Sequence, residues 1–329
     1  MIYILFFIAL IIAQLGYFRI ADHFNIIDKP NERSSHSQIT LRGGGVIFYI
    51  GILFYFIFEG FQYPWFFLGL TLIAIISFAD DIRPQSSKIR LLIHFVSVIL
   101  MFYQWRLFAF PWYFSLVALI VCTGILNAYN FMDGINGITG AYSLIVLIAL
   151  WYINTYSVPF VDNNMIFIVM LSLVVFNFFN FRTTAKCFAG DVGAISIAFI
   201  ILFLLGRLIL KTDDFSYIVL LAVYGVDTML TIIHRILLKE NIFEAHRKHV
   251  FQIMANELKM PHVVVSSFYA LLQGVIIYFY FVFKYYSYWY LAIVIVFLSV
   301  LYLLFKLKYF HKTEETEDRN LKVRNGGKK

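Results

Sequence analysis

The chain has 329 residues, of which 61% are hydrophobic, 19% aromatic and only 14% charged. Because soluble globular domains are about half apolar and about a quarter charged, this composition excludes a soluble protein and indicates a polytopic membrane protein. The net charge is +7, but basic and acidic residues are mixed in the C-terminal segment 306–329, which favours a solvated tail over a nucleic-acid-binding arm. No nucleic acid is expected as a partner.

Eleven apolar runs are long enough to cross a bilayer, which takes about 20 residues of helix. The first run lacks the basic start and the cleavage site of a signal peptide, so we expect it to be retained as a helix. The sequence thus predicts an all-α polytopic membrane protein with about eleven transmembrane helices, a membrane domain over residues 1–306 and a charged cytoplasmic tail over 307–329. The predicted spans are 2–21, 44–60, 63–79, 89–105, 111–129, 137–157, 164–181, 192–210, 215–238, 263–283 and 287–306.

The basic residues predict the orientation of these helices, because the cytoplasmic loops of membrane proteins carry an excess of Lys and Arg. With the N-terminus outside and the C-terminus in the cytoplasm, all but four of the 26 Lys and Arg residues lie on the cytoplasmic side. The polar stretches FADDIRPQSSKIR, NAYNFMDGINGITG, FAGDVG and EAHRKHVFQ then share that side. The chemistry of the protein is therefore expected at the cytoplasmic face.

Two adjacent carboxylates, Asp80 and Asp81, end an apolar run and precede Lys88 and Arg90. Adjacent carboxylates repel each other, and acidic side chains at membrane depth are unfavourable unless a cation or hydrogen-bond donors satisfy them. The pair indicates either a functional acid pair or a helix-end turn in which one Asp caps the next helix.

A polar stripe begins inside the fifth apolar run. Asn127, Asn130 and Asp133 recur at every third position, which places them near one face of a helix, and the glycines that follow allow close approach of a ligand or another helix. A tight turn rich in Asn and Gly is the alternative, but it explains two or three such residues and not a stripe that starts within the membrane. A binding site is therefore favoured.

Asp191 lies between glycines at the start of the eighth predicted span. It is either the N-cap of that helix or a ligand of Mg²⁺, which prefers oxygen ligands and commonly binds one or two carboxylates together with substrate phosphates. His246, Arg247 and His249 lie in a cationic inner loop. Flanking charge alone would explain the Arg but not the two His, and such a loop suits an anionic phosphate.

Two other polar segments receive plainer interpretations. Asp227 and Arg235, toward the inner end of the ninth span, are expected to form an ion pair or interfacial anchors. The first inner loop, in which Arg42 precedes three glycines, is expected to be a basic loop attracted to anionic lipid headgroups. A contact of this loop with a phosphate stays open.

Taken together, these stretches resemble the polyprenyl-phosphate N-acetylhexosamine-1-phosphate transferases, the family that includes the phospho-MurNAc-pentapeptide translocase. The resemblance covers nearly the whole chain and rests on DKPNERSSH followed by LRGGG, on the Asp pair followed by KIR, and on NAYNFMDGINGI, NFRTTAKCFAGDVGA and AHRKHVFQ. It implies transfer of a sugar-1-phosphate from a UDP-N-acetylhexosamine, such as UDP-GlcNAc, to undecaprenyl phosphate with release of UMP. The product would start a cell-envelope glycan such as O-antigen, at the cytoplasmic face of the bacterial inner membrane.

The resemblance also implies roles for single residues. Asp80, Asp81 and Asp133 would be catalytic, and Asp191 would be a ligand of Mg²⁺, with Mn²⁺ able to replace it. The implied substrate-binding residues are Lys88, Arg90, Asn127, Asn130, Asn136, Phe188, His246, Arg247 and His249. Asn136 departs from the family pattern, because many relatives have Asp there, so we do not expect it to be an essential metal ligand.

The alternative class is a transporter or flippase of lipid-linked sugars. Transporters bind their substrates near the bilayer midplane, often at broken helices in matching halves, whereas the polar residues of this chain cluster at inner helix ends. The enzyme is therefore favoured, and a homodimer stays open.

Overall fold

The computed structural model describes residues 2–30, 38–241 and 247–326. Within these ranges the chain is almost entirely helical, and its two short strands pair in antiparallel fashion, with Ile27 opposite Leu41. The elements in chain order are α1 (Ile2–His23), β1 (Ile27–Asp28), β2 (Thr40–Leu41), α2 (Val46–Phe58), α3 (Pro64–Ile82), α4 (Ser87–Trp105), η1 (Leu107–Ala109), α5 (Trp112–Met132), α6 (Ile138–Tyr156), α7 (Asn163–Asn180), α8 (Gly190–Thr212), η2 (Phe215–Leu221), α9 (Ala222–Leu237), α10 (Val250–Gln252), the π-helix η3 (Ile253–Glu257), α11 (His262–Val282), η4 (Lys284–Tyr286) and α12 (Ser287–Gly326).

The predicted all-α, multi-pass architecture is confirmed, whereas the predicted count of eleven spans is not. Ten helical segments of the described residues are long and apolar enough to cross a membrane, and each coincides with a predicted run. The remaining run, 44–60, corresponds to α2, which has 13 residues. At 1.5 Å per residue such a helix is about 20 Å long, shorter than the roughly 30 Å hydrocarbon core of a bilayer.

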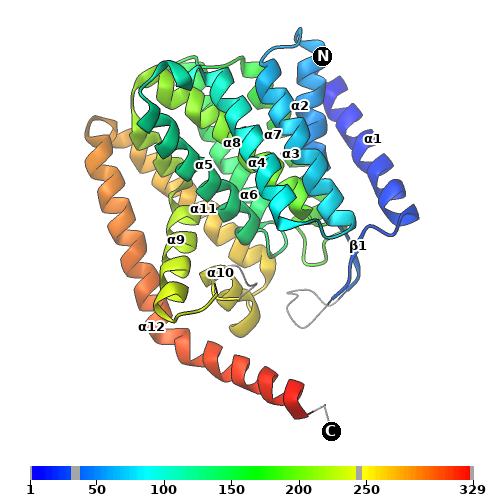
Figure 1. Ribbon diagram of the computed structural model, residues 1–329, viewed down its shortest axis with the longest axis vertical. Helices are drawn as coiled ribbons and strands as arrows, with labels where there is room; N and C mark the ends of the chain where they lie inside the picture. Colours follow the sequence, from blue (N-terminus) through cyan, green and yellow to red (C-terminus); the bar gives the residue numbers. More distant parts are fainter. Residues whose placement is uncertain (1, 31–37, 242–246, 327–329) are drawn as a thin grey trace.

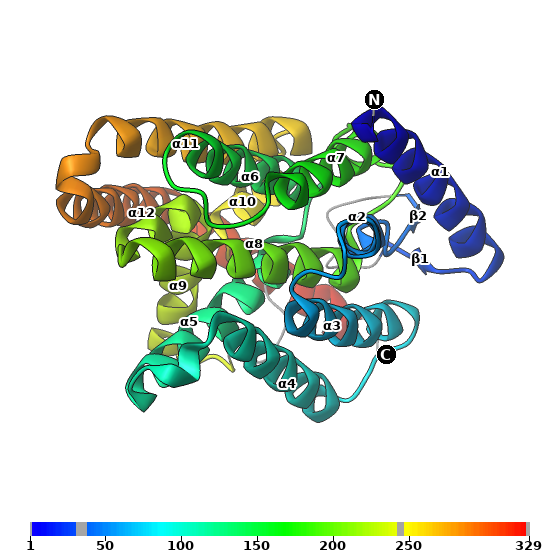
Figure 2. The ribbon, with the colours of Figure 1, turned by 90° about the horizontal axis from the view of Figure 1, so that it is seen from above.

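The helices form one bundle with α8 in its middle (Figures 1 and 2). Helix α8 contacts α2, α3, α5 and α6, and 83% of its most apolar 18-residue stretch is buried. A helix that is apolar on every side needs such surroundings, because it has no polar face to turn to water. The centre of the bundle is therefore built on the segment that follows Asp191.

The polar loops gather at one end of this bundle, which we call the site end. Helices α3, α5 and α7 end there and α4, α6 and α8 begin there, together with β1 and α10, at the bottom of Figure 1. Helix α1 begins at the opposite end, and α12 runs past the site end (Figure 1). The opposite end carries exposed aromatic side chains such as Trp112, Tyr285 and Trp289, a pattern typical of the membrane–water interface.

One span is broken. The predicted run 215–238 consists of the 3₁₀ segment η2 followed by α9. The buried side chain of Gln273 from α11 bridges the break, because its Nε2 donates to the Val219 carbonyl (3.0 Å) and its Oε1 accepts from the Val223 N–H (3.1 Å). Backbone groups freed by a break at membrane depth need partners of this kind.

Candidate active site

Three carboxylates from two helices meet at the site end. Asp80 and Asp81 occupy the last turn of α3, and Asp191 occupies the first turn of α8. The carboxyl groups of Asp80 and Asp191 are close enough to share a hydrogen bond. The structure thus brings the predicted acid pair and the predicted metal ligand into one cluster, although more than a hundred residues separate them in the sequence.

Asp81 caps a helix, but not the one that follows it. Its Oδ1 accepts a hydrogen bond from the Asp191 N–H (2.9 Å) and its Oδ2 accepts one from the Val192 N–H (3.0 Å). These N–H groups lack partners within α8, and the helix dipole favours a negative charge at that position. Gly190 has a φ of 71°, and a Cβ there would lie 2.5 Å from Asp81 Oδ2, so only glycine allows this approach.

Two guanidinium groups lie among the carboxylates. Arg42 Nε lies 2.7 Å from Asp81 Oδ1 and its Nη2 lies 3.4 Å from Asp191 Oδ1. Arg90 Nη1 donates to Asp80 Oδ2 and lies 3.5 Å from Asp191 Oδ2. Arg90 was predicted to bind substrate from its sequence position, whereas Arg42 was assigned only to a basic loop.

The three glycines after Arg42 are the sequence feature that indicates a close approach of this loop to another segment. The Gly44 N–H donates to the Phe188 carbonyl (2.8 Å) and the Gly45 N–H donates to the Ala189 carbonyl (3.0 Å). A Cβ on Gly45 would lie 2.3 Å from the Cα of Gly193, so two glycines let the backbones touch. Arg42 is thereby fixed against the start of α8.

The polar stripe on α5 points partly to solvent. Asn127 is exposed and Asn130 is half-buried, and neither side chain makes a hydrogen bond to another described residue, so both amides are available to a ligand. Asp133 follows the last residue of α5 and accepts a hydrogen bond from Thr139 Oγ1 (2.7 Å). Burial raises the pKa of the Asp133 carboxyl from 3.8 to about 6, a rise that the Thr139 hydrogen bond limits.

Asn136 joins two loops rather than facing the acid cluster. Its Nδ2 donates to the carbonyls of Arg182 (2.9 Å) and Thr183 (3.1 Å), and its backbone carbonyl accepts from Ser266 Oγ (2.7 Å). The donors of this amide are therefore used inside the protein. The side chain holds the α5–α6 connection against the α7–α8 connection.

Of the other predicted substrate-binding residues, Phe188 is half-buried and is held by backbone hydrogen bonds to the β2 segment and to Gly44. Lys88 is exposed in the first turn of α4, and Arg247 is half-buried. His246 lies outside the described residues.

His249 is buried at the N-cap of α10. Its Nδ1 lies 3.3 Å from Oδ1 of Asp227, which also accepts from the Val250 N–H (3.2 Å), while Asp227 Oδ2 accepts from Tyr269 Oη (2.6 Å). Asp227, which lies on α9, therefore holds residues 247–249, here called the His loop, against α9 and α11.

Of the two expectations for Asp227 and Arg235, an ion pair or interfacial anchors, the ion pair is wrong. Arg235 Nε instead lies 3.1 Å from Glu240 Oε2, because the turn after α9 brings Glu240 back to it. Asp227 already has four other partners. Burial raises the pKa of Glu240, but the hydrogen bonds from Lys248 and Arg235 outweigh it and hold the pKa below its usual value.

A divalent cation would fit the acid cluster only in part. Among residues 2–30, 38–241 and 247–326, no group of three His, Cys, Asp or Glu side chains is arranged to hold a metal ion. Both oxygens of Asp81 are used by α8, but Asp80 and Asp191 face each other, and two facing carboxylates favour a cation or a shared proton between them. Such a pair suits Mg²⁺, which takes its other ligands from phosphates and water.

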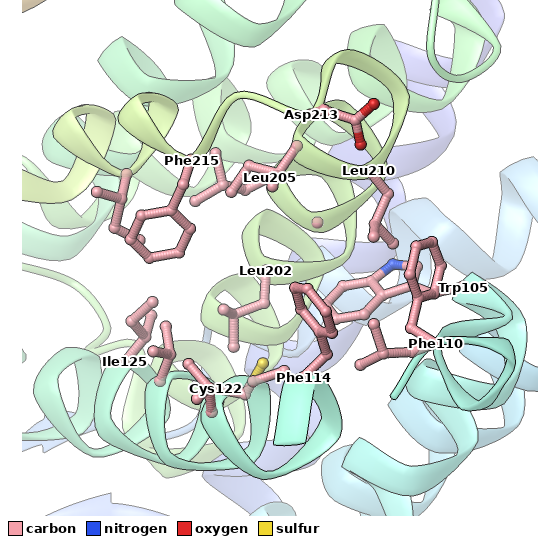
Figure 3. Close-up of a pocket in the computed structure, with 17 residues that line it drawn as sticks. Trp105, Phe110, Phe114, Cys122, Ile125, Leu202, Leu205, Leu210, Asp213 and Phe215 are labelled. Atoms are coloured by element: carbon pink, nitrogen blue, oxygen red, sulfur yellow. The ribbon is translucent and has the colours of Figure 1, made fainter. Parts of the chain in front are cut away.

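A separate apolar pocket of about 580 Å³ lies toward the opposite end, between α5, α8 and η2 (Figure 3). Trp105, Phe114 and Leu205 are among the residues that line it, and Asp213 is at its rim (Figure 3). The pocket is not part of the acid cluster, but α5 borders it with one face and carries the polar stripe at its other end.

Comparison with known proteins agrees with these features. Residues 63–208 match the profile of glycosyl transferase family 4. The chain is 29% identical over 259 residues to a probable undecaprenyl-phosphate N-acetylglucosaminyl 1-phosphate transferase of Bacillus subtilis (strain 168), covering 70% of each chain. It is 26% identical over 285 residues to an undecaprenyl-phosphate alpha-N-acetylglucosaminyl 1-phosphate transferase of Salmonella typhi, covering 78% of this chain and 77% of the relative. An enzyme of the same description from Escherichia coli (strain K12) is 27% identical over 261 residues, covering 72% of this chain and 71% of its own.

The matched region begins just before α3 and ends within α8. It therefore contains all three carboxylates of the acid cluster and the whole polar stripe. The match to the family 4 profile and these relatives agree with the resemblance that the sequence motifs predicted.

Proposed function

We propose that the protein transfers an N-acetylhexosamine-1-phosphate from a UDP-sugar to undecaprenyl phosphate and releases UMP. The observation that carries the proposal is the convergence, at one end of an apolar bundle, of Asp80, Asp81, Asp191, Arg42 and Arg90. The descriptions of the relatives support undecaprenyl phosphate as the acceptor and N-acetylglucosamine as the first sugar to test. None of the relatives supports the transporter alternative.

The reaction brings two polyanions together, so the site must neutralise charge. Guanidinium groups bind phosphate oxygens in bidentate fashion, and Arg42 and Arg90 supply two of them. Mg²⁺, held by Asp191 with Asp80 beside it, would neutralise the diphosphate and stabilise the leaving UMP. The amides of Asn127, which is exposed, and Asn130, which is half-buried, would extend this polar surface along α5 toward the nucleotide sugar.

The transfer is a single displacement at phosphorus. An oxygen of the lipid phosphate forms a bond to the phosphorus that carries the sugar, the bond from this phosphorus to the bridging oxygen breaks, and UMP leaves with that oxygen. The second pKa of a phosphate monoester is about 6, so the nucleophile is mostly dianionic at neutral pH and needs no general base. Asp81, whose two oxygens accept from the α8 backbone, positions Arg42 and Asp191.

The alternative is a covalent phospho-sugar intermediate on an Asp. The two chemistries differ in the absence of lipid acceptor. A direct displacement then leaves the UDP-sugar intact, whereas a covalent intermediate lets labelled UMP exchange into the UDP-sugar. We expect no exchange.

The multi-pass bundle would lie in the bacterial inner membrane with its site end in the cytoplasm, where UDP-sugars are found. The basic residues of the inner loops support this orientation. The prenyl chain of the acceptor would stay in the lipid, and the apolar walls between α5 and α8 suit part of it.

Purified protein tests the proposal directly. It should release UMP when Mg²⁺, undecaprenyl phosphate and one member of a panel of UDP-N-acetylhexosamines are all present, and not when the lipid is omitted. Absence of release with every sugar, from protein that is folded and monodisperse, would contradict the proposal.

A further inference from the structure

Arg42 contacts two carboxylates of the acid cluster through different nitrogens, whereas Arg90 contacts Asp80 and Asp191 through Nη1 alone. The contact of Nε with Asp81 is short (2.7 Å) and the contact of Nη2 with Asp191 is long (3.4 Å). The side chain of Arg42 is 33% exposed, whereas that of Asp81 is fully buried. The guanidinium is therefore anchored at one edge and accessible at the other.

The backbone that carries Arg42 is held on both sides. The Arg42 N–H donates to the Ile26 carbonyl (3.0 Å), and the Arg42 carbonyl accepts from Tyr17 Oη (2.5 Å). The glycines that follow Arg42 are bonded to the segment that leads into α8. The position of this guanidinium in the site is thus built into the fold, and only its outer part is free to move.

The charges explain why an arginine at this place affects a metal site. The cluster contains three carboxylates, and the guanidinium groups of Arg42 and Arg90 cancel two of the three negative charges. A metal dication binds weakly to carboxylates that are already paired with guanidinium groups, because the two positive charges repel each other at short range. A diphosphate would offer Arg42 a better bidentate partner than the distant oxygen of Asp191.

We propose that Arg42 couples metal binding to nucleotide binding. Without a diphosphate, its Nη2 neutralises Asp191. When a diphosphate binds, Nη2 leaves Asp191 for the phosphates, while Nε stays on Asp81. The release of Asp191 makes its carboxylate available to the metal, an inference that rests on the proposed function. Metal and UDP-sugar would then bind together rather than separately, and the acid cluster would not collect divalent cations when nucleotide is absent.

Binding of Mn²⁺, followed by electron paramagnetic resonance of the free ion, tests this coupling without catalysis. In the unmodified protein, UDP should tighten Mn²⁺ binding about tenfold or more, and by reciprocity Mn²⁺ should tighten UDP binding by the same factor. In Arg42→Gln, Mn²⁺ alone should bind about tenfold more tightly than in the unmodified protein, because one cation is removed beside Asp191. UDP should then change Mn²⁺ affinity less than about twofold.

Two further variants separate charge from geometry. Arg42→Lys keeps the charge but not the fork of donors, so Mn²⁺ alone should bind within about threefold of the unmodified protein while the coupling to UDP falls. Arg83→Gln removes an exposed cation of the same end that contacts none of the three carboxylates, and it should leave both affinities within about twofold.

The inference is overturned if Arg42→Gln binds Mn²⁺ no more tightly than the unmodified protein or retains its coupling to UDP. If the coupling is present in the unmodified protein and persists in Arg42→Gln, only the role of Arg42 is refuted. If the unmodified protein shows no coupling between UDP and Mn²⁺, the inference is overturned, whereas the proposed function is tested separately by UMP release.

Discussion

At the scale of single residues, two acids of the cluster, Asp81 and Asp191, have different surroundings. Asp81 is fully buried and accepts three hydrogen bonds, two from the α8 backbone and one from Arg42. Asp191 is 21% exposed by its side chain, and its contacts with the arginines are long. Asp81 therefore stabilises the site, whereas Asp191 is available to a ligand.

Replacing each of these acids by its amide should separate stability from activity. Asp81→Asn loses a charged acceptor at the α8 N-terminus and leaves Arg42 without its closest partner, so the free energy of unfolding should fall by about 2 kcal/mol. Asp191→Asn keeps the backbone N–H that donates to Asp81, so its thermal midpoint in detergent should stay close to that of the unmodified protein. Its UMP release should be lost. Full turnover by Asp191→Asn with Mg²⁺ would refute its role as a metal ligand.

Asp133 should govern an acid limb of the pH–rate profile. Burial raises its pKa to about 6, so its charged form, which the polar site would use, is lost as the pH falls through that value. Thr139→Val removes the hydrogen bond that lowers this pKa, and the limb should move to higher pH. The lipid phosphate titrates in the same range, but the substitution does not change it, so an unmoved limb would exclude Asp133 as the titrating group.

At the scale of elements, the His loop depends on α9. Asp227 lies on α9 and accepts from His249, from the backbone of α10 and from Tyr269 of α11. Three separate segments thus meet at one carboxylate that is only 5% exposed. Asp227 acts through His249 and is a positioning residue.

Asp227→Asn should weaken this attachment, since an amide oxygen is a poorer acceptor than a carboxylate. We expect kcat/KM for the UDP-sugar to fall about tenfold, with a smaller change in KM for the lipid acceptor. Asp214→Asn is the matched control, because it breaks an ion pair with Lys284 at the opposite end of the bundle. Equal kinetic effects of the two substitutions would show that the loss is general destabilisation and not misplacement of the His loop.

The sequence predicted the helices better than the contacts between their ends. Long apolar runs are a local property, and ten of them became long helices. Helix α2 begins only after Gly44 and Gly45, because their N–H groups are bonded to the segment that enters α8. A hydropathy pattern does not contain this contact.

The same distinction applies within the site. The motifs identified Asp80, Asp191 and Arg90, which the structure brings together. Arg42 was missed because its partners lie 39 and 149 positions away. The three glycines beside it indicate a close approach of backbones but not which segment they approach. An ion pair was one of two expectations for Asp227 and Arg235, and it is wrong because Arg235 pairs with Glu240 across the turn after α9.

At the scale of the whole molecule, the positive-inside distribution predicts that the site end faces the cytoplasm. Labelling of single introduced cysteines tests this orientation, because both native cysteines, Cys122 and Cys187, are buried. Arg83→Cys, exposed at the site end, should react with an impermeant thiol reagent only in inverted vesicles. Tyr285→Cys, 90% exposed at the other end, should react in intact spheroplasts, and the reverse pattern would invert the proposed topology.

The central claim is that the bundle transfers a sugar together with its phosphate. UDP-N-acetylglucosamine, or whichever UDP-sugar supports UMP release, can be labelled with radioactive phosphorus at the phosphate next to the sugar and incubated with the purified protein, Mg²⁺ and undecaprenyl phosphate. We predict that the label moves into the lipid product and that the released nucleotide is unlabelled UMP, with neither change in Asp191→Asn. Recovery of the label in UDP, with only the sugar on the lipid, would contradict the account.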